Sequence, residues 1–147
     1  MIRKVTPKDR EIFIELGVEF YASDAVSHNI PKTYLERAFD ELMRSEDRLN
    51  AYLFEVEGIV VGYALIAKMF SCEAGGICNM IEELYIREEH RGKHLASNFF
   101  EFISRTRPNE VKRFRLEAVP ENERAIRLYK RYGFDTLNYL QLIREFE

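Results

Sequence analysis

The sequence predicts an α/β protein with a mixed β-sheet, and three observations favour this class. Segments whose apolar residues follow helical spacing alternate along the chain with segments rich in β-branched and aromatic residues. The predicted order is strand, helix, helix, three strands, helix, strand, helix and two strands, which is typical of a mixed sheet. The chain is 46% hydrophobic, enough for one core, and contains no linker or internal repeat. We therefore expect a single domain over residues 1–147.

The first half of the chain is predicted to form a strand, two helices and a hairpin. Leu35, Phe39 and Leu42 lie at helical spacing in the second helix, and Pro31 suits its first turn. The change to β-branched and aromatic residues around Gly58 predicts an antiparallel hairpin. The predicted elements are a strand at residues 2–6, helices at 9–21 and 31–44, and paired strands at 49–57 and 59–68.

The second half is predicted to alternate strands with helices. Phe114, Leu116 and Ala118 alternate with charged residues, as in a half-buried strand. Ligands of open α/β sheets bind beyond the carboxyl ends of strands, so we expect the site at the strand-to-helix junctions that follow Ile86 and Ala118. The predicted elements are a strand at 77–86, a helix at 93–105, a strand at 112–118, a helix at 122–132, and two short strands within 134–146 around Leu137-Asn138.

Composition excludes several classes of protein. Lys and Arg number 22 and Asp and Glu 25, and this net charge of −3 argues against a nucleic-acid partner. The longest uncharged run, Gly58–Ala67, is far shorter than the about 20 residues of a membrane-spanning helix. The first ten residues lack the apolar core of a signal peptide. Cys72 and Cys78 match neither a disulfide framework nor a metal site. We therefore expect a cytoplasmic protein without a metal and without a membrane partner.

The segment Glu88–Ala96 opens the third predicted helix with several basic side chains. Arg91, Lys93 and His94 stand where a helix presents free N–H groups and partial positive charge, so cations there are unfavourable by about 0.3–1 kcal/mol each. A bound phosphate would remove that conflict. Alternatively, the two glutamates that precede them neutralise this end, and Gly92 only turns the chain.

Two motifs resemble those of the GNAT superfamily of acetyl-CoA-dependent N-acetyltransferases, whose cofactor motif is Gln/Arg-x-x-Gly-x-Gly/Ala. After the strand Ile81–Ile86, Arg91 and Ala96 match the ends of that pattern, and His94 departs from it where the first glycine is usual. The second motif is Asn122-x-x-Ala125-x-x-x-Tyr129-Lys130-x-x-Gly133-Phe134. The resemblance covers the whole chain. It implies a GNAT-like, mostly antiparallel twisted sheet with a splayed central strand pair and about four helices.

The resemblance implies that acetyl-CoA is the acetyl donor. The N–H groups of Gly92–Ala96 would hold its pyrophosphate, Arg91 would add charge, and the backbone of Leu84–Ile86 would pair with the pantetheine arm. A helical φ would accommodate His94 with its ring pointing outward. Asn122 would bond the pantetheine amide, or serve as a helix N-cap. The implied cofactor-contacting residues are Leu84, Tyr85, Ile86, Arg91, Gly92, Lys93, His94, Leu95, Ala96, Asn122, Ala125 and Tyr129.

Acetyl transfer to an amine needs a base and an acid. A lysine-like amine has a pKa of about 10.4, so its deprotonation at neutral pH costs roughly 4–5 kcal/mol, and a nearby carboxylate can take the proton. Glu82, expected to share a strand face with Met80 and Leu84, matches the base proposed in the spermidine/spermine branch of the family. Glu83 is the alternative base, and either carboxylate could instead be solvated or paired with an arginine. Tyr129 matches the family's tyrosine acid, and its alternative is a tyrosine of the core.

The sequence therefore predicts an N-acetyltransferase that moves an acetyl group from acetyl-CoA to a primary amine of a small molecule or peptide by direct attack. The alternative is a non-catalytic CoA-binding sensor or regulatory module. The presence of a candidate base, Glu82, and a candidate acid, Tyr129, argues against this alternative. Polyamines, aminoglycosides, amino acids and protein N-termini all stay open as acceptors. The resemblance allows a homodimer, a state common in the family.

Overall fold

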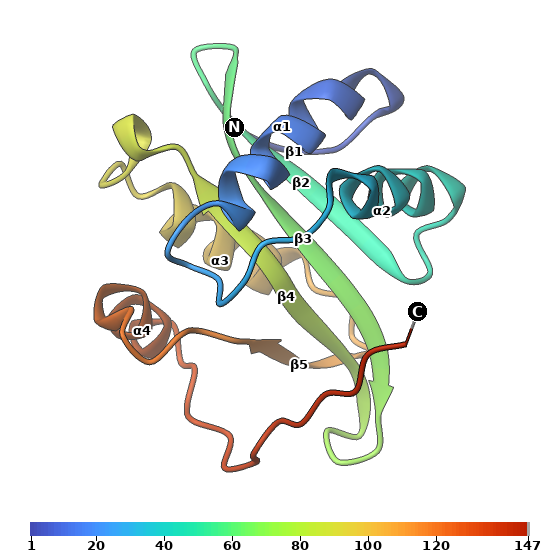
Figure 1. Cartoon of the computed structure of the whole chain (residues 1–147). Coiled ribbons are helices and arrows are strands. Elements are labelled where there is room, and N and C mark those ends of the chain that lie inside the picture. The colour runs from blue at the N-terminus through green and yellow to red at the C-terminus, as the bar shows by residue number, and fades with distance from the viewer. Residues whose placement is uncertain (147) are drawn as a thin grey trace.

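The centre of the computed structural model, which describes residues 1–146, is a five-stranded sheet in the order β1-β2-β3-β4-β5 (Figure 1). Strands β1 to β4 pair antiparallel, and β5 runs parallel to β4. The predicted mixed, mostly antiparallel sheet is therefore confirmed. In chain order the elements are β1 (Ile2–Lys4), the short turn η1 (Pro7–Asp9), α1 (Arg10–Tyr21), α2 (Lys32–Arg44), β2 (Leu49–Val56), β3 (Ile59–Ser71), β4 (Gly76–Ile86), the short turn η2 (Glu88–His90), α3 (Leu95–Thr106), β5 (Val111–Leu116) and α4 (Glu123–Arg131).

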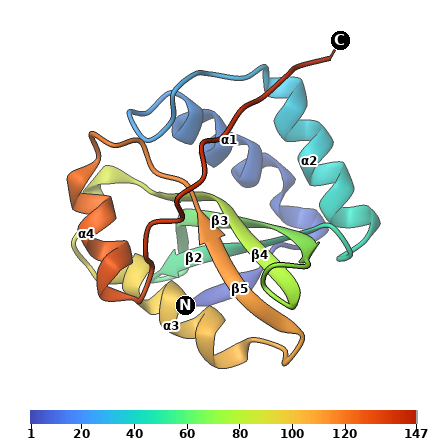
Figure 2. The same ribbon diagram turned by 90° about the horizontal axis from the view of Figure 1, so that it is seen from below.

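Helices cover both faces of the sheet, with α1 and α2 on one face and α3 on the other (Figures 1 and 2). Side chains alternate along a strand, so the neighbours Leu53 and Phe54 enter different buried clusters. On the first face Phe13 of α1 packs edge-on against Tyr63 of β3. On the second, Phe99 of α3 lies 5.4 Å from Phe54, measured between ring centroids. No helix among residues 1–146 has the length and apolar character that crossing a membrane requires.

Strands β4 and β5 separate halfway along β4. Their last paired residues are Ile81 and Leu116, whereas β4 itself continues to Ile86. After Leu116 the chain leaves the sheet and leads to α4. The predicted splayed strand pair is therefore present, and its opening lies between the second half of β4 and the connection to α4.

A β-bulge in β4 marks the same place. Glu83 lies opposite Leu65 of β3 and Ile81 lies opposite Ile66, so Glu82 is an extra residue without a partner on β3. A bulge bends its strand and increases the local twist. The bulge on one edge of β4 and the loss of pairing on its other edge coincide, which leaves Glu82 without a paired residue on either neighbouring strand.

The two strands predicted within 134–146 are absent, and this prediction was wrong. The segment has no regular structure in its described part, residues 134–146, and Leu140, Leu142 and Phe146 are at least 80% exposed. Two side-chain hydrogen bonds tie it down, from Tyr139 and Gln141 to glutamates near β5. Apolar alternation alone does not make a strand, because a strand also needs a partner with which to pair its backbone. Figure 2 shows the segment running across the molecule as a single extended trace.

Candidate active site

A small cavity of about 40 Å³ lies at the opening between β4 and β5. It brings together residues of four elements and their connections, and those that matter for chemistry are Glu82, Leu84, Glu117, Asn122 and Tyr129. Four of these five were predicted as site residues from sequence. Glu117 was missed, since it appeared only as the charged partner in an alternating strand. Strand separation is what gathers these polar groups, because a continuous β4–β5 ladder would close the space between them.

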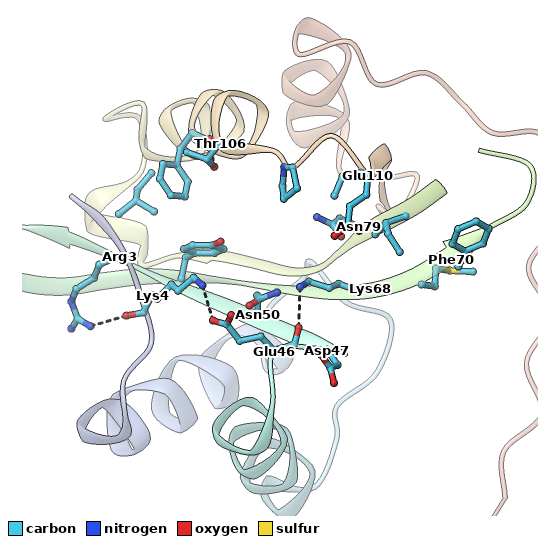
Figure 3. A pocket seen from close by; sticks show the side chains of 17 residues that line it. Arg3, Lys4, Glu46, Asp47, Asn50, Lys68, Phe70, Asn79, Thr106 and Glu110 are labelled. Carbon is cyan, nitrogen blue, oxygen red and sulfur yellow. Dashed lines mark hydrogen bonds and ion pairs between the residues drawn. The ribbon is translucent and has the colours of Figure 1, made fainter. Parts of the chain in front are cut away.

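A larger hollow of about 700 Å³ lies on the α3 side of the sheet, toward the beginning of β4 (Figure 3). Its polar groups include Lys4 and Glu46, which form an ion pair of 2.6 Å, and Lys68, which donates to the carbonyl oxygen of Glu46 at 2.9 Å. None of the residues that line it was predicted to take part in acetyl transfer. We assign the active site to the smaller cavity between β4 and β5, because Glu82 and Tyr129 line that cavity and not the larger hollow.

Glu83 is the most enclosed carboxylate of the region, with 5% of its surface exposed. Its carboxylate accepts hydrogen bonds from the phenols of Tyr21 at 2.5 Å and Tyr63 at 2.6 Å. Burial raises the pKa of Glu83, and the two phenol hydrogen bonds partly oppose that rise. The alternative of an ion pair between Glu83 and an arginine is not seen among residues 1–146, and the two tyrosine partners were not predicted. They come from α1 and β3, so only the tertiary fold brings them to Glu83.

Glu82 lies in the bulge and stays open to solvent. Partial desolvation and the nearby carboxylate of Glu117 raise its pKa. The prediction that Glu82 shares a face with both Met80 and Leu84 was wrong. The bulge interrupts the alternation, so Leu84 packs with Ile81 in the α3-side cluster, while Met80, next to Ile81 in the regular part of the strand, points to the other face. Glu82 is thus free of the core and lines the cavity.

Tyr129 combines the two roles that the sequence left open. Its ring packs edge-on against Phe100 at 5.8 Å and belongs to the α3-side cluster, as expected of a core tyrosine. It also lines the cavity, and its hydroxyl has no hydrogen-bond partner among residues 1–146. Burial raises the pKa of Tyr129, so the phenol stays protonated at neutral pH. Packing therefore positions a free hydroxyl at the opening.

Asn122 is the N-cap of α4. Its Oδ1 accepts a hydrogen bond from the N–H of Ala125 at 3.3 Å. The amide nitrogen of the same side chain is not used by this cap. The two predicted roles of Asn122 are therefore compatible, because the cap occupies the oxygen and leaves the Nδ2 group able to donate.

The turn from Arg91 to Ala96 leads into α3, and its main-chain N–H groups beyond Arg91 are unpaired. The N–H groups of residues 92–96 donate to no acceptor among residues 1–146. Gly92 has φ +76° and His94 has φ +61°. The expectation of a helical φ at His94 was wrong, because α3 begins one residue later, at Leu95. Histidine tolerates this left-handed region better than most residues, which explains how it stands where a glycine is usual.

The side chains of this turn point in different directions. Arg91 folds back, donates from Nε to the carbonyl oxygen of Ile86 at 2.9 Å, and lies over the ring of Tyr85 at 5.8 Å. Lys93 is exposed, with Nζ 3.4 Å from a ring nitrogen of His90. The guanidinium of Arg91 thereby joins the end of β4 to the start of the turn and occupies one of the main-chain carbonyls of Leu84–Ile86.

Comparison with known sequences identifies the class to which this fold and site belong. The profile described as "Acetyltransferase (GNAT) family" matches residues 15–134, so the chain belongs to the GNAT acetyltransferase family. The search among curated proteins found no match.

Solved structures share the fold over nearly the whole chain. A possible acetyltransferase from Clostridium difficile 630 is 18% identical, with a TM-score of 0.85, over 100% of this chain and 97% of the other. AAC(6')-Iy, in complex with the bisubstrate analogue CoA-S-monomethyl-acetylneamine, is 14% identical, with a TM-score of 0.79 and coverage of 99% and 97%. A ribosomal-protein-alanine N-acetyltransferase from Brucella melitensis biovar Abortus 2308 is 17% identical, with a TM-score of 0.75 and coverage of 99% of both chains.

Proposed function

We propose that the protein transfers the acetyl group of acetyl-CoA to a primary amine of a small molecule or peptide. The observation that carries this proposal is the opening between β4 and β5, where a bulge carboxylate, Glu82, and a free phenol, Tyr129, line one cavity. A base for the amine and an acid for the departing thiolate are the two groups that such a transfer requires.

The donor is bound by main-chain groups. The unpaired N–H groups of residues 92–96 lie at the N-terminus of α3, where a pyrophosphate is favoured by hydrogen bonding and by the helix dipole. The half of β4 that β5 leaves unpaired offers main-chain groups to the pantetheine arm. Asn122 donates from Nδ2 to the same arm.

The reaction is a direct transfer in which every atom is accounted for. Acetyl-CoA supplies an activated acyl group as a thioester. The amine nitrogen forms a bond with the carbonyl carbon, the bond from carbon to sulfur breaks, and the thiolate leaves with the electron pair. Glu82 takes the proton that the amine loses, since its raised pKa makes it a better base than an ordinary carboxylate. Tyr129 gives its proton to the thiolate. It regains a proton through water from the acylated nitrogen, which loses its second proton as the amide forms. The net products are the amide, the thiol and the proton held by Glu82.

Glu83 stays the alternative base. Its pKa is also raised, but both carboxylate oxygens accept phenol hydrogen bonds, and the side chain is buried. A proton could reach it only through Tyr21 or Tyr63 or through a rearrangement. Glu82 needs neither, because it lines the cavity directly.

The solved relatives support the donor more than the acceptor. AAC(6')-Iy was crystallised with a CoA-containing bisubstrate analogue, which is consistent with a CoA site in this fold. The names of the relatives differ in acceptor, since one is an aminoglycoside enzyme and another a ribosomal-protein-alanine enzyme. Because these structures are only 14–17% identical to the chain, they do not indicate which of those acceptors it uses.

The donor site is tested by Gly92→Val. An added Cβ at Gly92 meets nothing within 4 Å, so the change acts through φ +76°, which a β-branched residue resists. A shift of this turn would misplace the N–H groups, and calorimetry should show CoA binding weakened at least tenfold, about 1.4 kcal/mol. Gly58→Val is the matched control, because Gly58 has φ +77° and equally open surroundings in a remote hairpin. Equal CoA affinity in the two variants would refute the donor site.

The transfer itself is tested by free-thiol release from acetyl-CoA with a panel of primary amines. Turnover with an amine, and none without, is expected. Tight CoA binding with no release of thiol in the presence of any amine would refute the proposed transfer and indicate the non-catalytic CoA-binding module instead.

A further inference from the structure

Three carboxylates gather around the opening between β4 and β5. Glu82 and Glu117 line the cavity, and Glu83 follows Glu82 in β4 and is buried beneath it. The lining contains no lysine, arginine or histidine. None of the three carboxylates forms an ion pair within residues 1–146. The site thus holds negative charge without a protein cation to balance it.

Several of the cations that lie near the opening along the chain are engaged elsewhere. Arg87, just after β4, binds Glu19 and Glu15 of α1. Arg91 donates to a main-chain carbonyl, and Arg113 of β5 pairs with a glutamate of the β3–β4 turn at 3.1 Å. Hydrogen bonds from Tyr139 and Arg113 lower the pKa of that glutamate, and the charge of Arg115 adds a smaller contribution.

The pKa shifts of Glu82 and Glu83 also indicate that the carboxylates lie close to one another and have no cation beside them among residues 1–146. Besides burial, the charge that raises the pKa of Glu82 is that of Glu117, and the charge that raises the pKa of Glu83 is that of Glu82. Glu117 accepts one hydrogen bond, from the neutral amide of Gln141 to Oε2 at 2.9 Å, which supplies no countercharge and leaves Oε1 free.

We infer that the acceptor is a dicationic amine, and that Glu117 binds its second ammonium group while the first is acetylated at Glu82. This inference rests on the proposed function and names the acceptor class for it. One carboxylate suffices to receive the proton of the reacting amine. A further one that lines the cavity, exposed and uncompensated, matches a positive charge that stays on the acceptor throughout the reaction.

The inference fits the apolar part of the lining as well. Leu84, Leu116 and Phe20 surround the carboxylates, so a chain of methylene groups between two ammonium groups would meet apolar side chains. An acceptor with a carboxylate close to its amine would instead place like charges together, which is unfavourable in a partly desolvated site. The site therefore discriminates against free amino acids.

The test compares amines of equal length. Wild-type protein is assayed for thiol release with putrescine and butylamine, and with cadaverine and pentylamine. We expect kcat/KM to be at least tenfold higher for each diamine, with the advantage shrinking as salt is added, since salt screens exposed charges. Equal kcat/KM for diamine and monoamine would overturn the inference and leave the proposed acetyl transfer standing.

The variant Glu117→Gln tests whether the preference for diamines depends on the carboxylate of Glu117. We expect the ratio of diamine to monoamine efficiency to fall about tenfold, mainly through the KM of the diamine. Glu121→Gln removes the same charge from an exposed position outside the lining and should keep the ratio. An unchanged ratio in Glu117→Gln would also overturn the inference. If no amine releases thiol, the proposed function fails, and calorimetry of cadaverine on CoA-saturated wild type and Glu117→Gln decides the inference alone: equal binding refutes it.

Discussion

Tyr63→Phe isolates the hydrogen bond that supports the buried carboxylate of Glu83. Tyr63 is fully buried, and its phenol donates to Oε1 of Glu83 at 2.6 Å. Phenylalanine keeps the ring and its packing but leaves Oε1 without that donor. A hydrogen bond to a charged group contributes about 1.5–3 kcal/mol, and one to a neutral group about 0.5–1.5 kcal/mol. The loss of unfolding free energy should therefore depend on the protonation of Glu83.

The sign of the pH dependence follows from the raised pKa. Because burial raises the pKa of Glu83, the folded protein keeps this proton to a higher pH than the unfolded chain. That contribution to stability is complete below the ordinary pKa of about 4.3 and is lost as pH rises through the folded value. Removing a donor raises the pKa of Glu83 further. The destabilisation by Tyr63→Phe should accordingly grow with pH and then level off.

Urea unfolding across a series from about pH 5 to about pH 9 measures this effect. At the high end the unfolding free energy should fall by about 1.5–3 kcal/mol. Thermal unfolding at the same pH should then show a melting temperature lower by roughly 3–12 °C, since about 2–4 °C corresponds to 1 kcal/mol in a protein of this size. Tyr52→Phe is the control, because Tyr52 is half-buried on β2 and its hydroxyl has no partner among residues 1–146. A deficit that is independent of pH, or that matches the control, would refute the role assigned to the phenol.

Three further outcomes are expected. Tyr129→Phe should keep stability and CoA affinity while lowering kcat by about 10²- to 10⁴-fold in thiol-release assays, and full activity would make Tyr129 a purely structural residue. Glu82→Gln should depress the acetylation rate most at low pH, where little free amine is present, and recover toward high pH; the same profile in Glu83→Gln alone would move the base one residue along. His94→Val should lower the unfolding free energy by about 1–2 kcal/mol, whereas His94→Gly should not, as followed by circular dichroism; equal stability would contradict the left-handed backbone.

Local pattern sufficed for most helices and strands. The apolar spacing of α2 and the β-branched run of β3 depend on residues a few positions apart, and both elements formed where they were expected. The order of elements, together with the two motifs, also placed Glu82, Asn122 and Tyr129 around one opening.

What could not be read from the sequence depends on distant pairing. The bulge at Glu82 is a property of the register between β3 and β4, and alternation within β4 alone predicted a regular strand. The phenols on Glu83 come from 62 and 20 positions away. The prediction of two C-terminal strands was wrong for the same reason. The alternating pattern of residues 139–146 does not indicate whether another strand is available to pair with this segment. The backbone of His94 depends on where α3 begins, and helix ends are the least predictable part of a helix.

The bulge also predicts how the sheet would respond to a deletion in β4. If Glu82 were deleted, Ile81 and Glu83 would become neighbours opposite Ile66 and Leu65, and the β3–β4 ladder would run without interruption. Every later residue of β4 would keep its present face of the sheet. The sheet itself therefore does not need Glu82. The strand carries one residue more than its architecture requires, and that surplus residue bears the carboxylate at the mouth of the opening.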